Sequence, residues 1–138
     1  MNNEFKINPY ESVGDIRFGM AKDEIMALFG KEPDNISFDY LQRTNMMWDN
    51  ISIKLNAKEL VNDISFVDSK YKIFYKDISV MEGSGALIKL LNKTEKPLNT
   101  VGFKVYFAVG IALTGFGKSK EDKTISVFSK ELIKLWKE

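Results

Sequence analysis

Apolar positions near the start of the chain predict a short amphipathic helix. They share one helical face, at the spacing i, i+4, i+7 and i+8: Ala21, Ile25, Leu28 and Phe29. Gly19 before this run allows a sharp turn, Gly30 is placed to end the helix, and Pro33 prevents its continuation. We therefore predict a short extended entry, a turn at Gly19 and one compact helix that ends at Gly30.

The period of the pattern changes after this helix. Between residues 36 and 75, apolar residues alternate with polar ones, as in strands that bury one face. Asp49 and Asn50 lie between two such runs, and both tolerate the positive φ of a hairpin turn. We predict an antiparallel meander of about four short strands. The polar residues of its wetter face include Ser52, Lys54 and Ser65.

The second half of the chain repeats this layout in a weaker form. The motif at residues 15–18 returns at 77–80, and three of the apolar helix positions have leucine counterparts. Alternating segments follow, and a short apolar helix ends the chain. We predict one α+β domain over residues 1–138. It consists of two pseudo-repeats of a helix followed by an antiparallel meander, at about 13–75 and 76–138.

Composition excludes several classes of chemistry. The 138 residues, one domain by length, include 20 basic and 19 acidic side chains and no cysteine or histidine. The net charge of +1 argues against nucleic-acid binding, which depends on a basic excess. Without cysteine and histidine, the chain has no disulfide, no thiolate nucleophile and no imidazole to serve as a general base near neutral pH. We predict no cofactor and no metal site.

The apolar runs of the chain are short. The start lacks the apolar run of a secretory signal, and no stretch approaches the ~20 apolar residues of a membrane-spanning helix. We therefore expect a cytoplasmic protein that has no membrane partner.

Acidic residues are numerous enough for a catalytic pair to be considered. Two carboxylates can hydrolyse a glycoside, and several can hold a magnesium ion. Most of the acids lie at turns or in the first turn of a helix, where they have structural reasons to be, and none has a recognised cation-binding spacing: Asp15, Asp23, Glu24, Asp34, Asp39, Asp63, Asp68 and Asp77. A carboxylate-lined pocket, in a small-molecule-binding protein or a hydrolase, stays an alternative.

A polar sheet face with aromatic and basic residues is the preferred candidate site. Tyr106 is out of phase with Val105 and Phe107, so we expect it on the wetter face beside Lys104. Tryptophan, tyrosine and basic side chains on one face are typical of protein-binding surfaces. Ordinary surface aromatics, or a packed second face, explain the same pattern. The predicted partner-binding residues are Tyr40, Trp48, Lys54, Lys104, Tyr106 and Thr114.

The opening segment resembles a motif of a widespread group of small bacterial proteins. Residues 13–25, with the Leu-Phe-Gly at 28–30, are similar to G-x-I-x-F-G-M-[ST]-x-x-E-V-x-x-x-L-G. Residues 109–113 and 125–130 are similar to the group's ending, L-G-I-x-L followed by V-S-V-F-x-K. Several members look like immunity or toxin-associated proteins. The resemblance implies a non-enzymatic protein-binding module that neutralises a bacterial toxin, and it brings no catalytic residues.

The helix-then-meander unit also resembles the β-lactamase inhibitor protein and the small lipoproteins of outer-membrane assembly. That resemblance implies tandem units that form one curved sheet, with helices on one face and a concave binding face on the other. Two departures stand out: Ala21 replaces the usual Ser or Thr, and the lipid-bearing cysteine is missing. We predict a partner protein and a monomer or homodimer. The alternatives are the small-molecule pocket named above and a homodimeric accessory protein whose sheet extends across two copies.

Overall fold

The computed structural model describes residues 4–38, 43–67, 71–81, 84–100, 102–115 and 123–137. The described residues are mostly β, with 47% of them in strands and 22% in helices. The helices are α1 (Lys22–Phe29), α2 (Ser84–Thr94), a 3-10 turn (Lys130–Leu132) and α3 (Ile133–Trp136). The strands are β1 (Glu4–Asn8), β2 (Ser12–Val13), β3 (Ile16–Arg17), β4 (Asn35–Phe38), β5 (Thr44–Trp48), β6 (Ile51–Leu55), β7 (Val61–Val67), β8 (Lys72–Tyr75), β9 (Ile78–Ser79), β10 (Leu98–Thr100), β11 (Phe103–Tyr106), β12 (Ile111–Thr114) and β13 (Thr124–Phe128).

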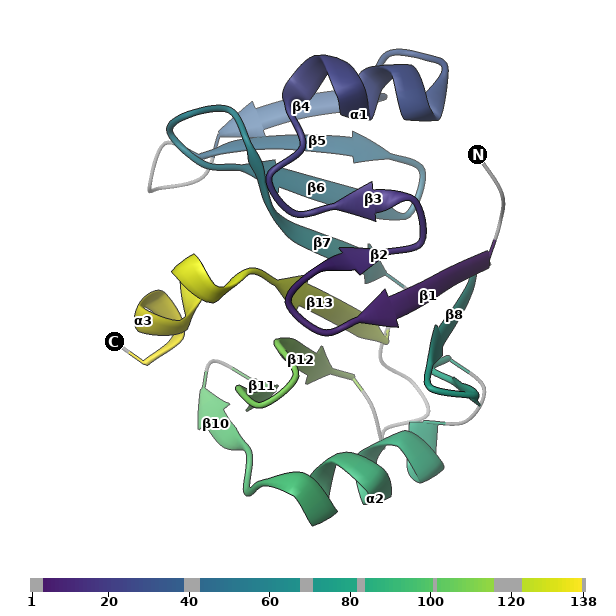
Figure 1. The fold of residues 1–138 in the computed structure, drawn as a ribbon, viewed down its shortest axis with the longest axis vertical. Helices are drawn as coiled ribbons and strands as arrows, with labels where there is room; N and C mark the ends of the chain where they lie inside the picture. The colour runs from purple at the N-terminus through teal and green to yellow at the C-terminus, as the bar shows by residue number, and fades with distance from the viewer. Residues whose placement is uncertain are drawn as a thin grey trace.

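A large antiparallel sheet forms the centre of the molecule (Figure 1). Its strand order is β10-β11-β12-β13-β7-β6-β5-β4. Strands β4 to β7 come after α1 and β10 to β13 come after α2, and within each set every strand pairs with the next. The two sets meet where β13 pairs with β7, from Thr124 opposite Val67 to Phe128 opposite Asp63.

A smaller sheet joins the start of the chain to its middle. Its order is β3-β2-β1-β8-β9, and β1 runs parallel to β8 with Phe5 opposite Ile73 and Ile7 opposite Tyr75. The apolar residues of β1 alternate with polar ones, so Phe5 and Ile7 are buried while Glu4 and Lys6 are exposed. Phe5 packs against Phe66 of the large sheet with ring centroids 5.1 Å apart. The small sheet therefore covers part of the large one.

The main core lies on one face of the large sheet, here called the first face. Its sheet residues include Met46, Ile53 and Ile64, and the small sheet, α1 and α2 pack over them. Helix α1 contributes the fully buried Ile25, and α2 contributes Leu87 and Leu91. The alternating and helical patterns of these elements thus converge on one apolar interior.

The opposite face, here called the second face, is only partly covered. Phe128, Val105 and Ala112 on this face form a smaller core with Leu132 of the 3-10 turn and Trp136 of α3. Elsewhere the second face carries polar side chains, among them Asn45, Ser52, Lys54, Asp63, Ser65 and Ser126. The end of the chain therefore caps the apolar part of this face and lies next to its polar part.

Helix α1 confirms the first element predicted from the sequence. It begins after Ala21 and ends at Gly30, whose φ of 71° is the left-handed conformation that favours glycine. Ala21 has no side-chain oxygen to cap the helix, but its backbone N–H donates a hydrogen bond to Glu24 Oε1 over 3.1 Å. The hairpin predicted at Asp49 is also present, with a φ of 52° at this residue.

The predicted fold class is wrong. The chain is not an α+β domain of two pseudo-repeats at 13–75 and 76–138 with one curved sheet and helices on one face: the part that the structure describes is mostly β and forms two sheets. Strand β8, expected to end the first meander, pairs instead with β1 in the small sheet. Helices lie on both faces, because α1 and α2 cover the first face and α3 packs on the second. Alternation shows that a segment is a strand, but it does not identify the strand with which it pairs.

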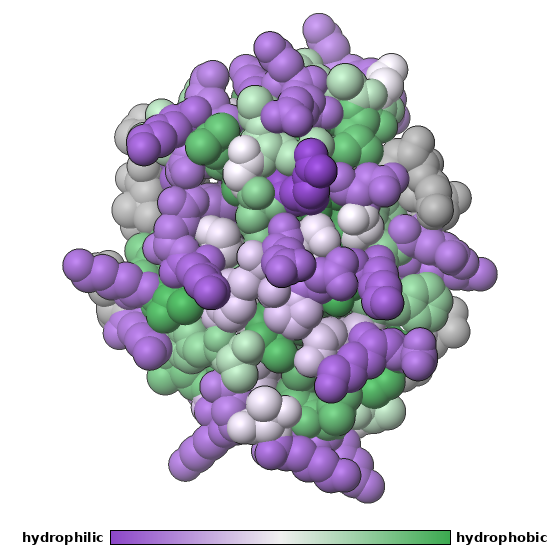
Figure 2. Space-filling model, in the orientation of Figure 1, coloured by the Kyte–Doolittle hydropathy of each residue, from purple (hydrophilic) through white to green (hydrophobic). Residues whose placement is uncertain are grey.

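The surface seen in Figure 2 mixes hydrophilic and apolar residues, which interleave over this side of the molecule. None of the helices that the structure describes combines the length and the apolar character needed to cross a membrane.

Candidate functional site

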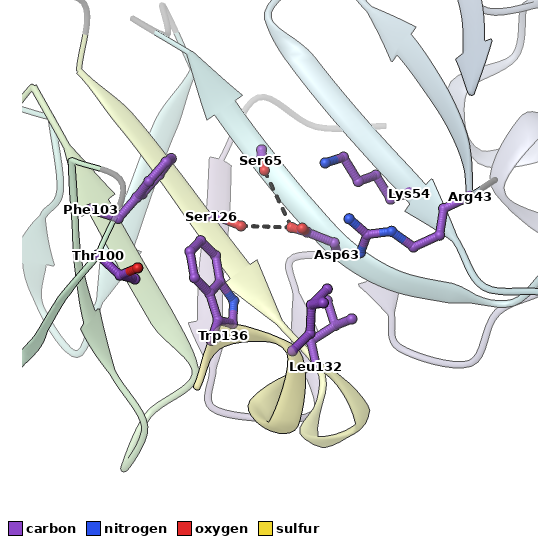
Figure 3. Close-up of a pocket in the computed structure, with 10 residues that line it drawn as sticks. Arg43, Lys54, Asp63, Ser65, Thr100, Phe103, Ser126, Leu132 and Trp136 are labelled. Atoms are coloured by element: carbon purple, nitrogen blue, oxygen red, sulfur yellow. Dashed lines mark hydrogen bonds between the residues drawn. The ribbon is translucent and has the colours of Figure 1, made fainter. Parts of the chain in front are cut away.

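The second face holds a hollow of about 390 Å³ between the sheet and the end of the chain, here called the Asp63 pocket (Figure 3). Its volume lies at the lower end of the range typical of small-ligand sites. The lining residues are Arg43, Lys54, Asp63, Ser65, Thr100, Phe103, Ser126, Leu132, Leu135 and Trp136.

Asp63 lies at the floor of the pocket and is 6% exposed. Its Oδ1 accepts a hydrogen bond from Ser126 Oγ over 2.7 Å and another from Ser65 Oγ over 3.3 Å. Strand register explains this arrangement: Ser65 lies two residues after Asp63 on the same face of β7, and Ser126 of β13 is directly opposite Ser65. The two serines hold the carboxylate group in place.

The pKa of Asp63 is raised above its ordinary value of 3.8, because burial disfavours the charged carboxylate. The hydrogen bond from Ser126, the charges of Lys54 and Arg43 and the hydrogen bond from Ser65 all act in the opposite direction and offset part of this effect. Asp63 is therefore a carboxylate whose charge is stabilised by its neighbours but still carries a desolvation cost.

Two basic side chains share one side of the pocket with Asp63. Lys54 of β6 is directly opposite Asp63 in the strand pairing, and Arg43 immediately precedes β5. Figure 3 shows Lys54 and Arg43 on the same side of the carboxylate. Among the described lining residues, the two cations exceed the single acid by one positive charge.

Apolar side chains form the other side of the pocket. Trp136 of α3 packs edge-on against Phe103 of β11, with ring centroids 5.4 Å apart, and it also contacts Phe128 at 5.8 Å. Leu132 and Leu135 complete this wall. Because α3 docks on the apolar part of the second face, its tryptophan is placed beside the polar floor. The pocket therefore has a basic end and an aromatic end.

The structure separates the partner-binding residues predicted from the sequence. Lys54 and Thr114 lie on the second face, and Lys54 lines the Asp63 pocket. Thr114 donates a hydrogen bond from Oγ1 to the carbonyl oxygen of Gly102 over 2.9 Å. Tyr40 lies outside the described residues.

Trp48, Lys104 and Tyr106 lie on the first face instead. Trp48 is 1% exposed, and its Nε1–H donates to the carbonyl oxygen of Lys31 over 3.0 Å. Its ring stacks on Phe29 with centroids 4.1 Å apart and planes 6° apart. Lys104 is exposed and lines a separate shallow hollow at the C-terminal end of α2. The predicted residues therefore do not form one surface.

Tyr106 corrects a specific expectation. Its side chain does point away from that of Val105, as the alternation indicates, but it is 0% exposed because α2 covers it. The hydroxyl group donates a hydrogen bond to Asn92 Oδ1 over 2.8 Å. Burial raises the pKa of Tyr106, and the nearby Glu95 carboxylate raises it further. Tyr106 is a core residue and is not open to a partner.

The sequence pattern does not single out the Asp63 pocket. Asp63 is one of the eight acids considered above, and the alternation of Ser65 with Ile64 and Phe66 places this serine on a wetter face. This alternation is the feature of the sequence that points toward the pocket. Arg43, Ser126, Phe103 and Trp136 are brought to the same place by strand register and by the docking of α3.

Comparison with protein-family models, with curated proteins and with solved structures gives no match to this chain. The resemblance of its opening segment to immunity-like bacterial proteins therefore stays a prediction.

Proposed function

We propose that the protein is a non-enzymatic binding protein that recognises a segment of another protein at the Asp63 pocket. The observation that carries this proposal is the pairing of a basic end, formed by Lys54 and Arg43, with an aromatic end formed by Trp136 and Phe103. Aromatic and arginine side chains around a small hollow are typical of the anchor points of protein interfaces.

The arrangement of acids favours binding over catalysis. Asp63 is the single carboxylate among the described residues that line the pocket. Hydrolysis by paired carboxylates needs a second one, as acid, base or nucleophile. The hydrogen bonds from Ser126 and Ser65 also hold Asp63 in one position, as expected of a group that shapes a site. The hydrolase alternative therefore has less support than a binding role.

The kind of partner is suggested by the resemblance of the opening segment alone. It favours a bacterial toxin, which makes the protein an immunity-type protein. A nuclease is the less favoured target, because inhibitors of nucleases are often strongly acidic and this chain has a net charge of +1. The compartment in which binding occurs, expected from the sequence to be the cytoplasm, stays a prediction.

Photo-crosslinking in the native host tests the proposal. We would place a benzophenone-bearing residue at Thr100, which lines the pocket, and, as a matched control, at the exposed Lys89 of α2 on the first face. We expect one defined protein adduct from position 100 that is absent from position 89. The same adducts from both positions, or no adduct from position 100, would contradict the proposal.

One further observation favours a second candidate, the homodimeric accessory protein. Ile36 and Phe38 are 47% and 67% exposed on β4, which forms one edge of the large sheet. An edge strand with exposed apolar side chains is able to pair with the same strand of a second copy. Sedimentation velocity tests this candidate. If the protein is a homodimer of this kind, the wild type should form a dimer as its concentration rises, and Phe38→Lys should abolish this dimer. A wild type that stays a monomer at all concentrations would contradict the candidate.

A further inference from the structure

The Asp63 pocket has the polarity of a site for one negative charge attached to an apolar body. Lys54 and Arg43 lie on one side of Asp63, whereas Phe103 lies on the other side (Figure 3). The described lining residues carry one more positive than negative charge. A ligand with a single anionic group therefore neutralises the basic end, while its apolar part covers the aromatic end.

Asp63 sets where that anion binds. Its carboxyl group is buried and held by Ser126 and Ser65, so the position of this acidic group on the floor of the pocket is fixed. It attracts the basic groups of Lys54 and Arg43 and repels a second carboxylate from its own position. The ligand carboxylate is thereby directed toward the lysine and the arginine. Arginine binds carboxylates with two parallel hydrogen bonds, which adds geometric selectivity.

The aromatic end selects the body of the ligand. Trp136 is only half-buried although it packs against Phe103 and Phe128, so part of its ring is open to the pocket. Flat apolar groups stack on such a surface and gain more than their buried area alone provides. The cavity of about 390 Å³ accommodates a body of the size of one aromatic side chain.

We propose that the Asp63 pocket binds a monocarboxylate that has a flat apolar group a few bonds from the carboxylate. Two sources provide this chemistry: a small aromatic acid, or the C-terminal residue of a polypeptide. The inference rests on the proposed function, since a partner protein would enter the pocket with its C-terminal residue, here an aromatic one.

Two-dimensional ¹⁵N NMR of the full chain provides the test. The chain has two tryptophans, one at the pocket and one, Trp48, buried on the first face. The probes are 3-phenylpropionate, the peptide acetyl-Gly-Gly-Phe with a free carboxyl group, and the same peptide as its C-terminal amide. We expect both acids to shift the indole N–H signal of Trp136 in a saturable manner while that of Trp48 stays in place. The affinity of the amide should be lower than that of the free acid by a factor of at least about ten, as expected when a charge-assisted hydrogen bond is lost.

Substitutions on the two faces complete the test. Lys54→Met should weaken binding of the free acid by about tenfold, and Lys54→Arg, which keeps the charge, should restore it. Lys104→Met on the first face is the matched control and should leave the affinity for the free acid unchanged. Equal binding of acid and amide, or an unchanged affinity in Lys54→Met, would overturn the inference.

The outcomes distinguish this inference from the proposed function. If a partner is crosslinked at position 100 but neither acid binds, the ligand chemistry is wrong and the proposed function stands. If 3-phenylpropionate binds and the peptide acid does not, the ligand is a small molecule and the proposed protein partner is wrong.

Discussion

Ser126 of β13 donates a hydrogen bond to Oδ1 of Asp63 on β7 over 2.7 Å, at the junction between the two sets of strands in the large sheet. Both side chains are buried, at 5% and 6% exposure. The junction therefore contains a polar contact whose loss leaves a buried carboxylate with one donor fewer.

Removing this hydroxyl group should destabilise the fold. We expect Ser126→Ala to lower the free energy of unfolding at pH 7 by about 1–3 kcal/mol, because the buried carboxyl group of Asp63 loses its shorter hydrogen bond and retains the longer one from Ser65. Ser65→Ala is the matched control and should have the smaller effect, because its hydrogen bond to Asp63 is longer, at 3.3 Å. Urea denaturation of both variants measures the difference. A larger loss in Ser65→Ala would contradict this account of the junction.

The raised pKa of Asp63 makes the stability of the protein depend on pH. The folded state binds the proton of this carboxyl group more tightly than the unfolded state, whose pKa is near 3.8. The stabilisation from this group is therefore complete below 3.8 and is lost as the pH rises through the folded-state pKa. We expect wild type to lose stability relative to Asp63→Asn as the pH rises above about 4. Urea denaturation at a series of pH values measures the free energy of unfolding of both proteins, with a substitution of the exposed Glu32, Glu32→Gln, as a control. If the free energy of unfolding depends on pH in the same way in wild type and Asp63→Asn, this effect is excluded.

The turn between β11 and β12 requires glycine at position 110. Gly110 has a φ of 67°, and a Cβ atom there would lie 2.9 Å from the Phe128 carbonyl oxygen and 2.9 Å from Tyr10 Cε1. Gly19 also has a positive φ, 88°, but a Cβ atom there would have no neighbour within 4 Å among the described residues. In both alanine variants the left-handed backbone conformation should lower the free energy of unfolding by about 1–2 kcal/mol. The loss should be larger in Gly110→Ala, because its Cβ atom also clashes with Phe128 and Tyr10. Thermal unfolding that ranks the two variants equally would count against the clash.

Tyr106 should prove to be a structural residue. Tyr106→Phe removes the hydrogen bond to Asn92 and should lower the free energy of unfolding by about 0.5–1.5 kcal/mol. Because the side chain is buried on the first face, partner crosslinking from position 100 should be unchanged in this variant. A stable Tyr106→Phe protein that fails to capture the partner would make Tyr106 a binding residue after all.

Local features of the fold could be predicted from the sequence. The apolar spacing that ends at Gly30 gives α1, and the alternation on either side of Asp49 gives the β5–β6 hairpin. These elements depend on neighbours in the sequence: a helical stripe, a C-terminal glycine and a turn residue that tolerates positive φ.

Long-range pairing could not be predicted in the same way. Nothing in the alternation of residues 4–8 states that they pair with β8, and a strand pattern fits either sheet equally well. Alternation assigns the side chain of Tyr106 to the correct side of its strand relative to Val105, but α2 decides that this side is buried. The Asp63 pocket likewise depends on where α3 docks, which no local pattern contains.

The parallel pairing of β1 with β8 has a consequence for synthesis on the ribosome. Strand β1 pairs with β2 on one side, but its other side stays unpaired until residues 72–75 have been synthesised. Strand β7 likewise pairs with β6 but has no partner on its other side until residues 124–128 have been synthesised. The nascent chain therefore carries an open strand edge until β13 has been synthesised, and such edges are where growing chains associate with one another. We expect ribosome-bound chains that end before residue 124 to remain protease-sensitive and to depend on chaperones, and chains that expose residues 124–128 outside the ribosome to become protease-resistant.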